Sequence, residues 1–498
     1  MQKRPNILFI LSDDQGAWAL GCAGNREIIT PNIDALARDG VRFENFYCAS
    51  PVCSPARASI LTGEMPSCHG VQDWLSGGNV NTANHPYMKD HYKFRTLDVG
   101  IEYLAGHPSY IAELARSGYT CALSGKWHLG NQEEAKEGFS KWFTISSGGC
   151  HYYAPDFYEN GEFTDCRDYV TDVITQRALD YLDELGKGPN PFCLQVHYTA
   201  PHSPWEAEEH PAEYLEMYKD CPFESVPVEP IHKCQVSSAP VGDTPEKRRE
   251  NLTGYYAAIT AMDAGIGRLV EKLKRDGLYE DTIIIFTADN GMNMGHHGIW
   301  GKGNGTYPPN MFDTSVKVPF VIRLPRAEVR GIVAERSATH CDLYPTILEL
   351  AGAKVGLNDK QPGESLVPYL ADGCPEGEER TVEIHDEYGF VRMLRRGRYK
   401  LVKNYLHGTS QLYDMVSDPE ETQDRIADHA LSAVVSELEG ELEAWFERYS
   451  DPKCDGRKAV ALTGSGQKDL CWKPDAFTDE NDLYYTGTQP EPRKGEIK

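Results

Sequence analysis

The stretch Asn6-Ile-Leu-Phe-Ile-Leu-Ser-Asp-Asp14 decides the fold of this chain, because a continuous apolar run ends in two adjacent carboxylates. An unbroken run of this length predicts a strand over 6–11 that is buried on both faces, as in a parallel sheet. Asp13 and Asp14 follow it directly, and two carboxylates there are unfavourable unless they meet a cation. In an open α/β sheet, binding sites form at this carboxyl edge.

Similar strands recur along the chain and alternate with helices. We expect further strands at residues 41–47, 119–124, 191–198, 282–287 and 318–323. Apolar spacing and capping residues predict helices at 30–40, 109–117, 168–185, 252–275 and 340–352. This alternation predicts an α/β fold with a large mixed, mostly parallel sheet flanked by helices.

The alternation stops near residue 375, which predicts a change of architecture. Short strands at 381–385, 390–395 and 399–403, followed by a helix at 431–449, indicate a small antiparallel sheet with a covering helix. We therefore expect a large N-terminal domain over 1–375, a small α+β subdomain over 376–451, and an extended polar tail over 452–498.

Composition narrows the function. The 498 residues are 40% hydrophobic and carry a net charge of −25, which argues against a general nucleic-acid binder. No apolar run is long enough to cross a membrane and no signal peptide is recognised, so we expect a cytoplasmic protein. The 14 cysteines form no C-x-x-C pair, which gives a zinc site little support.

Polar groups follow four of the predicted strands. They are Asp13 and Asp14, then Lys126 and His128, then His202, and finally Asp289 and Asn290. We expect all of them at one carboxyl edge of the sheet. The carboxylates and the Asn290 carbonyl are hard oxygen ligands, suited to Ca²⁺ or Mg²⁺ rather than to zinc.

Cations near these ligands predict an anion pocket within an acidic protein. Arg57, Lys126 and Lys302 would make the local field positive. The segment Cys53-Ser-Pro-Ala-Arg57 is read as a loop that turns into a helix, with Ser54 as N-cap and Gly63 as the stop. Cys53 would then lie at a helix N-terminus. Together these features describe a pocket for a phosphoryl or sulfuryl group.

At these residues the sequence resembles the type I, formylglycine-dependent sulfatases of the alkaline phosphatase-like superfamily. The resemblance is carried by the C-x-P-x-R signature at 53–57 with its trailing Ala-Ser-Ile-Leu-Thr-Gly63. It extends to Pro5–Asp14, Gly125–Gly130, Ala200–His202, Thr287–Gly291 and Gly298–Lys302, and to the C-terminal segments around Arg398 and Gln411.

The resemblance implies an alkaline phosphatase-like fold and a Cys53 that a formylglycine-generating or sulfatase-maturing enzyme oxidises to formylglycine. It also implies a metal ion, calcium rather than magnesium, held by Asp13, Asp14, Asp289, Asn290 and residue 53. One hydroxyl of the hydrated aldehyde, activated by the metal and Asp289, would attack sulfur and expel the alcohol.

The same resemblance assigns roles to the other polar residues. His202 and Lys302 would stabilise or protonate the leaving oxygen, and Arg57 and Lys126 would neutralise the sulfuryl oxygens. His128 would take the proton of the second hydroxyl, so that sulfate leaves as the aldehyde reforms.

We therefore expect a sulfuric ester hydrolase acting on a sulfated saccharide, such as one from glycosaminoglycan breakdown. One alternative is a phosphonate monoester or phosphodiester hydrolase on the same scaffold. Another is a non-catalytic, calcium-dependent carbohydrate-binding protein, should Cys53 remain a thiol. His85, His297 and Trp300 are candidate substrate contacts in Gly-rich loops. The tail is a candidate for lining the pocket or for packing on a second subunit of a homo-oligomer.

Overall fold

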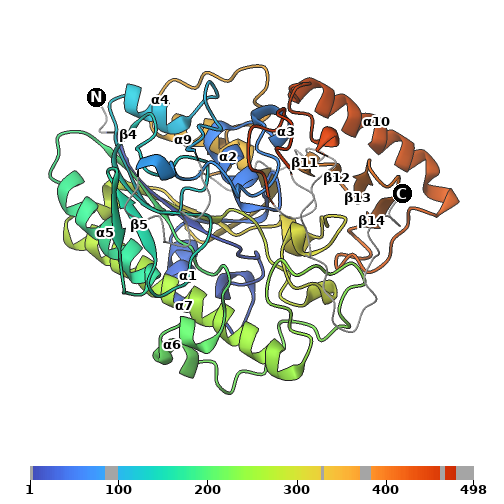
Figure 1. Cartoon of the computed structure of the whole chain (residues 1–498), viewed down its shortest axis with the longest axis horizontal. Helices are drawn as coiled ribbons and strands as arrows, with labels where there is room; N and C mark the ends of the chain where they lie inside the picture. The colour runs from blue at the N-terminus through green and yellow to red at the C-terminus, as the bar shows by residue number, and fades with distance from the viewer. Residues whose placement is uncertain (1–3, 85–98, 327–329, 371–382, 460–465, 478–498) are drawn as a thin grey trace.

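The computed structural model describes residues 4–84, 99–326, 330–370, 383–459 and 466–477 (Figure 1). A large sheet of ten strands organises this part of the chain. In spatial order its strands are β10 (Ile332–Thr339), β2 (Val41–Tyr47), β9 (Phe320–Arg323), β8 (Thr282–Ala288), β1 (Asn6–Ser12), β7 (Phe192–His197), β3 (Thr120–Gly125), β4 (Phe139–Ile145), β5 (Asp156–Glu159) and β6 (Glu162–Asp165).

The centre of the sheet is parallel, and this positions the polar strand ends side by side. Strands β8, β1, β7, β3 and β4 run in one direction, and the register pairs Ser12 with Ala288 and Leu11 with His197. Strand β9 runs antiparallel between β8 and β2, while β5 and β6 form an antiparallel edge. The expected mixed, mostly parallel sheet is confirmed.

Both faces of the sheet are buried under helices, as the apolar run of β1 predicts. Leu8 and Ile10 pack in one cluster with α1 (Pro31–Arg38), α5 (Val170–Leu185) and α7 (Pro245–Arg275). Ile7, Phe9 and Leu11 pack in another with α2 (Cys53–Thr62), α4 (Tyr110–Arg116) and α9 (Leu343–Leu350). Figure 1 shows these two helix layers on opposite sides of the sheet.

A four-stranded antiparallel sheet follows, formed by β11 (Glu383–Tyr388), β12 (Val391–Arg396), β13 (Tyr399–Asn404) and β14 (Ser410–Asp414). Helix α10 (Ser432–Tyr449) packs on β12 and β13, at the right of Figure 1. Tyr388, Phe390 and Met393 belong to the same apolar cluster as Phe9 of the large sheet. The two sheets therefore share a core.

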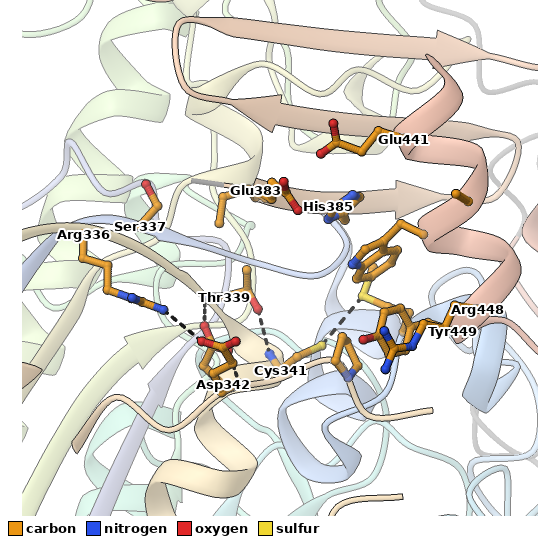
Figure 2. Close-up of a pocket in the computed structure, with 16 residues that line it drawn as sticks. Arg336, Ser337, Thr339, Cys341, Asp342, Glu383, His385, Glu441, Arg448 and Tyr449 are labelled. Atoms are coloured by element: carbon orange, nitrogen blue, oxygen red, sulfur yellow. Dashed lines mark hydrogen bonds and ion pairs between the residues drawn. The ribbon is translucent and has the colours of Figure 1, made fainter. Parts of the chain in front are cut away.

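A cavity of about 770 Å³ separates the rest of the small sheet from the large one. Figure 2 shows its lining, which comes from β10, the turn before α9, β11 and α10. Three short helices, α3 (Pro66–His69), α6 (Ala212–Glu216) and α8 (Asp313–Val316), lie in the connections between the longer elements. Within the described ranges, no helix combines the length and apolarity that a bilayer span requires.

The structure also contains elements that we did not expect. Strands β4, β5, β6, β10 and β14 were not predicted, because most of them lie at sheet edges and lack an unbroken apolar run. Helix α7 begins at Pro245, whereas the sequence pattern predicts its start at residue 252. The Thr244 side chain accepts a hydrogen bond from the Lys247 N–H (3.2 Å), and this Thr-Pro start is a signal that the sequence offered.

Candidate active site

Oxygen ligands meet where β1 and β8 end. Asp13, Asp14, Asp289 and Asn290 are all buried, and none is more than 4% exposed. Asp289 Oδ1 accepts hydrogen bonds from the backbone N–H groups of Asp14 (3.1 Å) and Asn290 (2.8 Å). Asn290 Nδ2 donates to Asp14 Oδ1 (2.9 Å). The parallel pairing of the two strands thus produces one cluster from segments 275 residues apart.

The cluster fits a hard divalent cation. One ligand atom from each of Asp13, Asp14, Asp289 and Cys53 lies within 4.8 Å of the others. The buried Oδ1 of Asn290 has no hydrogen-bond partner among the described residues. Burial disfavours the charged carboxylates, yet Lys302 holds the pKa of Asp14, and Arg57 that of Asp289, below the usual value. Both side chains are therefore ionised and ready to bind a metal.

Cys53 is the first residue of α2, as expected, but Ser54 is not its N-cap. Val52 occupies that position, and Ser54 Oγ accepts a hydrogen bond from the Leu75 N–H (3.1 Å) instead. The Cys53 Sγ lies 3.3 Å from Asp13 Oδ1 and 2.7 Å from Lys302 Nζ. Burial and the Asp13 carboxylate raise the pKa of Cys53 well above its usual value, so the residue is a neutral thiol.

Three buried cations surround the cluster. Lys126 Nζ lies 2.5 Å from Asp13 Oδ2, Lys302 Nζ lies 2.5 Å from Asp14 Oδ1, and Arg57 Nε donates to Asp289 Oδ2 (2.8 Å). Arg57 Nη1 also donates to the Lys126 carbonyl (2.9 Å), while its Nη2 has no hydrogen-bond partner among the described residues. The three cations offset the charges of the three carboxylates. The site therefore has little net charge within a chain of net charge −25, which favours an anion there over the rest of the surface.

Two histidines complete this group, and each has one ring nitrogen held by a carbonyl. His128 Nε2 lies 3.1 Å from the Leu75 oxygen, and its buried Nδ1 has no partner in the described chain. Burial, with Lys126 and Arg57 nearby, lowers the pKa of His128 well below its usual value, so the ring is neutral. His202 Nδ1 contacts the Ser203 oxygen (2.6 Å), and its Nε2 lies 3.7 Å from Asp14 Oδ2.

A cavity of about 430 Å³ opens over these residues, lined by Cys53, His128, His202 and Lys302. Its other described walls are mostly neutral, and are formed by Trp74, Leu75, Ser76, Asn79, Ser147, Gly148, Gly149, Ser237, Ser238 and Asn304. Residues 64–108 and 292–307 were expected to lie near the site, and Trp74 and Asn304 belong to these loops. Ser147–Gly149 and Ser237–Ser238 were missed, because no motif marks them.

The two candidate substrate contacts that the structure describes, His297 and Trp300, do not line this cavity. His85 lies outside the described residues. The His297 ring stacks on Phe312, with ring centroids 3.8 Å apart. Trp300 is 2% exposed and packs in an apolar cluster against Gly242, where an added Cβ would lie 2.2 Å from the indole. Neither His297 nor Trp300 lines the cavity, because each ring packs against another segment of the chain.

Two protein-family models match this chain. The sulfatase family model matches residues 5–353, and a model for the C-terminal region of N-sulphoglucosamine sulphohydrolase matches residues 295–448. The chain is 29% identical to an N-acetylglucosamine-6-O-sulfatase of Bacteroides thetaiotaomicron, covering 93% of this chain and 90% of the relative. It is 30% identical to an uncharacterized sulfatase of Escherichia coli, covering 90% and 88%.

Solved structures show the same architecture. A complex with the substrate D-glucosamine-2-N,6-O-disulfate superposes with a TM-score of 0.75 at 25% identity, covering 91% of this chain and 99% of the other. A phosphonate monoester hydrolase of Agrobacterium radiobacter superposes with a TM-score of 0.66 at 23% identity, covering 90% and 96%. The second likeness concerns the fold alone.

Proposed function

Because the chain belongs to the sulfatase family and is a sulfuric ester hydrolase, we propose that it removes sulfate from a saccharide. The observation that carries this proposal is the buried carboxylate cluster paired with Arg57, Lys126 and Lys302. Cys53 and Lys302 of this group also line the cavity. That group suits a tetrahedral anion, and the neutral serine and asparagine walls suit the hydroxyl groups of a sugar.

We further propose that Cys53 is converted to formylglycine and that Asp13, Asp14, Asp289 and Asn290 hold a calcium ion with it. Asn290 Oδ1, which has no hydrogen-bond partner among the described residues, and the carboxylate donors support a hard divalent cation such as calcium. The hydrated formylglycine would supply the oxygen nucleophile, and the calcium ion would supply positive charge beside it.

The side chains of this chain have separate tasks in this proposal. Arg57 and Lys126 neutralise the sulfuryl oxygens. The Arg57 Nη2 lies 4.0 Å from Asp13 Oδ1 and makes no hydrogen bond to the described residues. Lys302 and His202 line the cavity and stabilise or protonate the leaving oxygen. His128 is neutral, and its Nδ1 is free to accept a proton at the end of the cycle.

Replacement of Cys53 tests both the sulfatase activity and the conversion of this residue to formylglycine. We expect Cys53→Ala to abolish turnover of an aryl sulfate, whereas Cys22→Ala, a half-buried cysteine outside the cavity, retains it. Mass spectrometry of the active protein should show the Cys53 peptide lighter by about 18 Da than the thiol form. Full turnover by Cys53→Ala would refute the mechanism.

The substrate is tested by desulfation of a panel of defined mono- and disaccharides. The relatives that support a carbohydrate are an N-acetylglucosamine-6-O-sulfatase and an ulvan-active sulfatase. We expect at least one sulfated sugar to exceed choline sulfate and aryl sulfates in kcat/KM. The opposite ranking across the whole panel would exclude a saccharide substrate.

The shared fold with a phosphonate monoester hydrolase supports a second candidate reaction at the same site. A sulfate monoester and a phosphonate monoester with one common leaving group separate the two reactions by their kcat/KM values. We expect the sulfate ester to be preferred.

A further inference from the structure

Residues 70–77 connect the cavity wall to His128. Trp74, Leu75 and Ser76 line the cavity. The Leu75 carbonyl accepts hydrogen bonds from Asn79 Nδ2 (2.9 Å) and from His128 Nε2 (3.1 Å), and the Leu75 N–H is held by Ser54 Oγ next to Cys53. The position of the Leu75 backbone therefore sets the orientation of the His128 ring.

A distant residue, Gln467 of the C-terminal tail, holds this segment by its backbone and by its side chain. Its N–H donates to the Trp74 oxygen (2.8 Å), and its oxygen accepts from the Ser76 N–H (2.9 Å), so these bonds bracket Leu75 on both sides. Its side-chain Oε1 accepts from the Gln72 N–H (2.8 Å) and its Nε2 donates to the Gly70 oxygen (3.1 Å). Gln467 is fully buried.

The tail and the segment are in direct backbone contact. A Cβ added at Gly77 would lie 2.7 Å from the Lys468 oxygen, and one at Gly466 would lie 2.7 Å from the Trp74 oxygen. The tail is itself braced, because Lys468 N–H donates to the Ala476 oxygen (2.8 Å). Such close pairing leaves residues 70–77 little freedom to shift away from His128.

We propose that Gln467 is a positioning residue for the sulfatase reaction, acting through Leu75 on His128. This proposal rests on the role proposed above for His128. The Leu75 oxygen can only accept, so it selects the tautomer that carries its proton on Nε2 and leaves the lone pair on Nδ1. Release of residues 70–77 frees the ring and removes that selection.

The test uses the full chain with Gln467→Ala and Gln467→Glu. The alanine variant loses all three side-chain hydrogen bonds, of which the third runs from Nε2 to the Asp469 oxygen (2.8 Å). The glutamate variant keeps an acceptor for the Gln72 N–H and loses the Nε2 donor. Lys473→Ala is the control in the same tail, because its ammonium contacts only the Asp469 carboxylate. The glutamate variant serves as the test if the alanine variant does not fold.

Two readouts decide the outcome. Hydrogen–deuterium exchange of the 70–77 peptide should accelerate in both Gln467 variants and not in Lys473→Ala. The kcat of Gln467→Ala should fall about ten- to a hundredfold, as expected for a misplaced catalytic group. In a His128→Ala background the same substitution should cause no further loss, because both changes act on one group.

Different results would contradict the role of Gln467 and the role of His128. Unchanged exchange of residues 70–77, or losses that multiply in the double variant, would overturn the positioning role of Gln467 while leaving the function of His128 intact. Full activity of His128→Ala would instead overturn the proposed role of His128, and the proposal for Gln467 with it.

Discussion

At the scale of single residues, the site is built from backbone positions that few residues adopt. Asp14 has φ 63° and His128 has φ 57°, both in the left-handed region that is unfavourable for non-glycine residues. Each follows a central parallel strand closely, and each is locked by hydrogen bonds to another segment. Strain of this kind persists where the surrounding contacts over-determine the backbone, and here it points functional groups into one cavity.

Gly148 and Gly149 are adjacent, but an added side chain at each position would meet a different histidine. A Cβ at Gly148 would lie 2.1 Å from His128 Nε2, whereas one at Gly149 would lie 3.5 Å from His202 Cε1, an ordinary contact. We expect Gly148→Ala to lower kcat/KM about ten- to a hundredfold by displacing the imidazole. Gly149→Ala should stay within about threefold of the unchanged enzyme, because no ring moves. Equal activities would contradict this account of His128.

Asn290 provides a test of the metal site that needs no turnover. Asn290→Leu removes the unpartnered Oδ1 at similar volume, and we expect calcium affinity to fall at least about tenfold. The rise in Tm that calcium gives to chelator-treated protein should shrink accordingly. Asn293→Leu is the control, since both of its side-chain polar atoms have partners in the protein. An unchanged calcium response of Asn290→Leu would exclude this ligand.

At the scale of elements, the contact between β11 and α10 depends on a neutral histidine. His385 of β11 stacks on Trp445 of α10, with ring centroids 3.9 Å apart. Figure 2 shows His385 among the residues that line the large cavity. Burial lowers the pKa of His385 to about 3, and its Nε2 has no partner among the described residues. This interface is therefore sensitive to acid.

The sign of that sensitivity follows from the lowered pKa. Between pH 6.5 and 3 the unfolded chain binds a proton at His385 that the folded chain does not, so folding stability falls as the pH decreases. We expect His385→Phe to remove about 2 kcal/mol of the stability lost between pH 7.5 and 5. Denaturant unfolding at both pH values measures this difference. Parallel pH profiles of the two proteins would show that His385 is not responsible.

At the scale of the whole molecule, the two sheets are joined by buried charges as well as by a shared core. Lys400 of β13 is fully buried and contacts Asp313 Oδ1 of α8 (2.8 Å) and Glu421 Oε1 (2.7 Å). Glu421 Oε2 accepts a hydrogen bond from the Asp313 N–H (2.6 Å). Burial raises the pKa of Glu421 to about 7, and the nearby Lys400 limits that rise.

Removal of Lys400 should therefore lower the free energy of unfolding by an amount that depends on pH. At pH 8, Lys400→Met leaves the buried Glu421 carboxylate without its cation, and we expect a loss of about 3–5 kcal/mol in unfolding free energy. The half-buried Asp313 still has Arg395 Nη1 at 3.3 Å. At pH 5.5 the loss should be smaller, because Glu421 binds a proton. Lys403→Met on the same strand, whose partners Glu439 and Glu443 are more exposed, should lose less than about 1 kcal/mol. Equal losses in the two variants would argue against a buried charge network.

The sequence by itself determined the central strands and the polar residues at their ends. The run at 6–11 is apolar after its first residue, and the run at 282–287 is apolar between its two end residues. Burial on both faces can therefore be predicted without knowledge of neighbouring strands. The signature at 53–57 and the ligands at 13, 14, 289 and 290 are local patterns of the same kind. These features can be predicted from the sequence because each depends on the residue types within one short segment.

Only the tertiary structure decided how distant segments meet. Three features depend on strand partners that no local pattern specifies. They are the antiparallel course of β9, the strands β4 to β6 and β10 toward the two edges of the sheet, and the pairing of Lys126 with Asp13. The same holds for Gln467, which bonds to backbone groups of residues 70–76. Backbone groups are alike in every residue, so a contact made through them leaves no mark in the sequence and emerges only when the chain is folded.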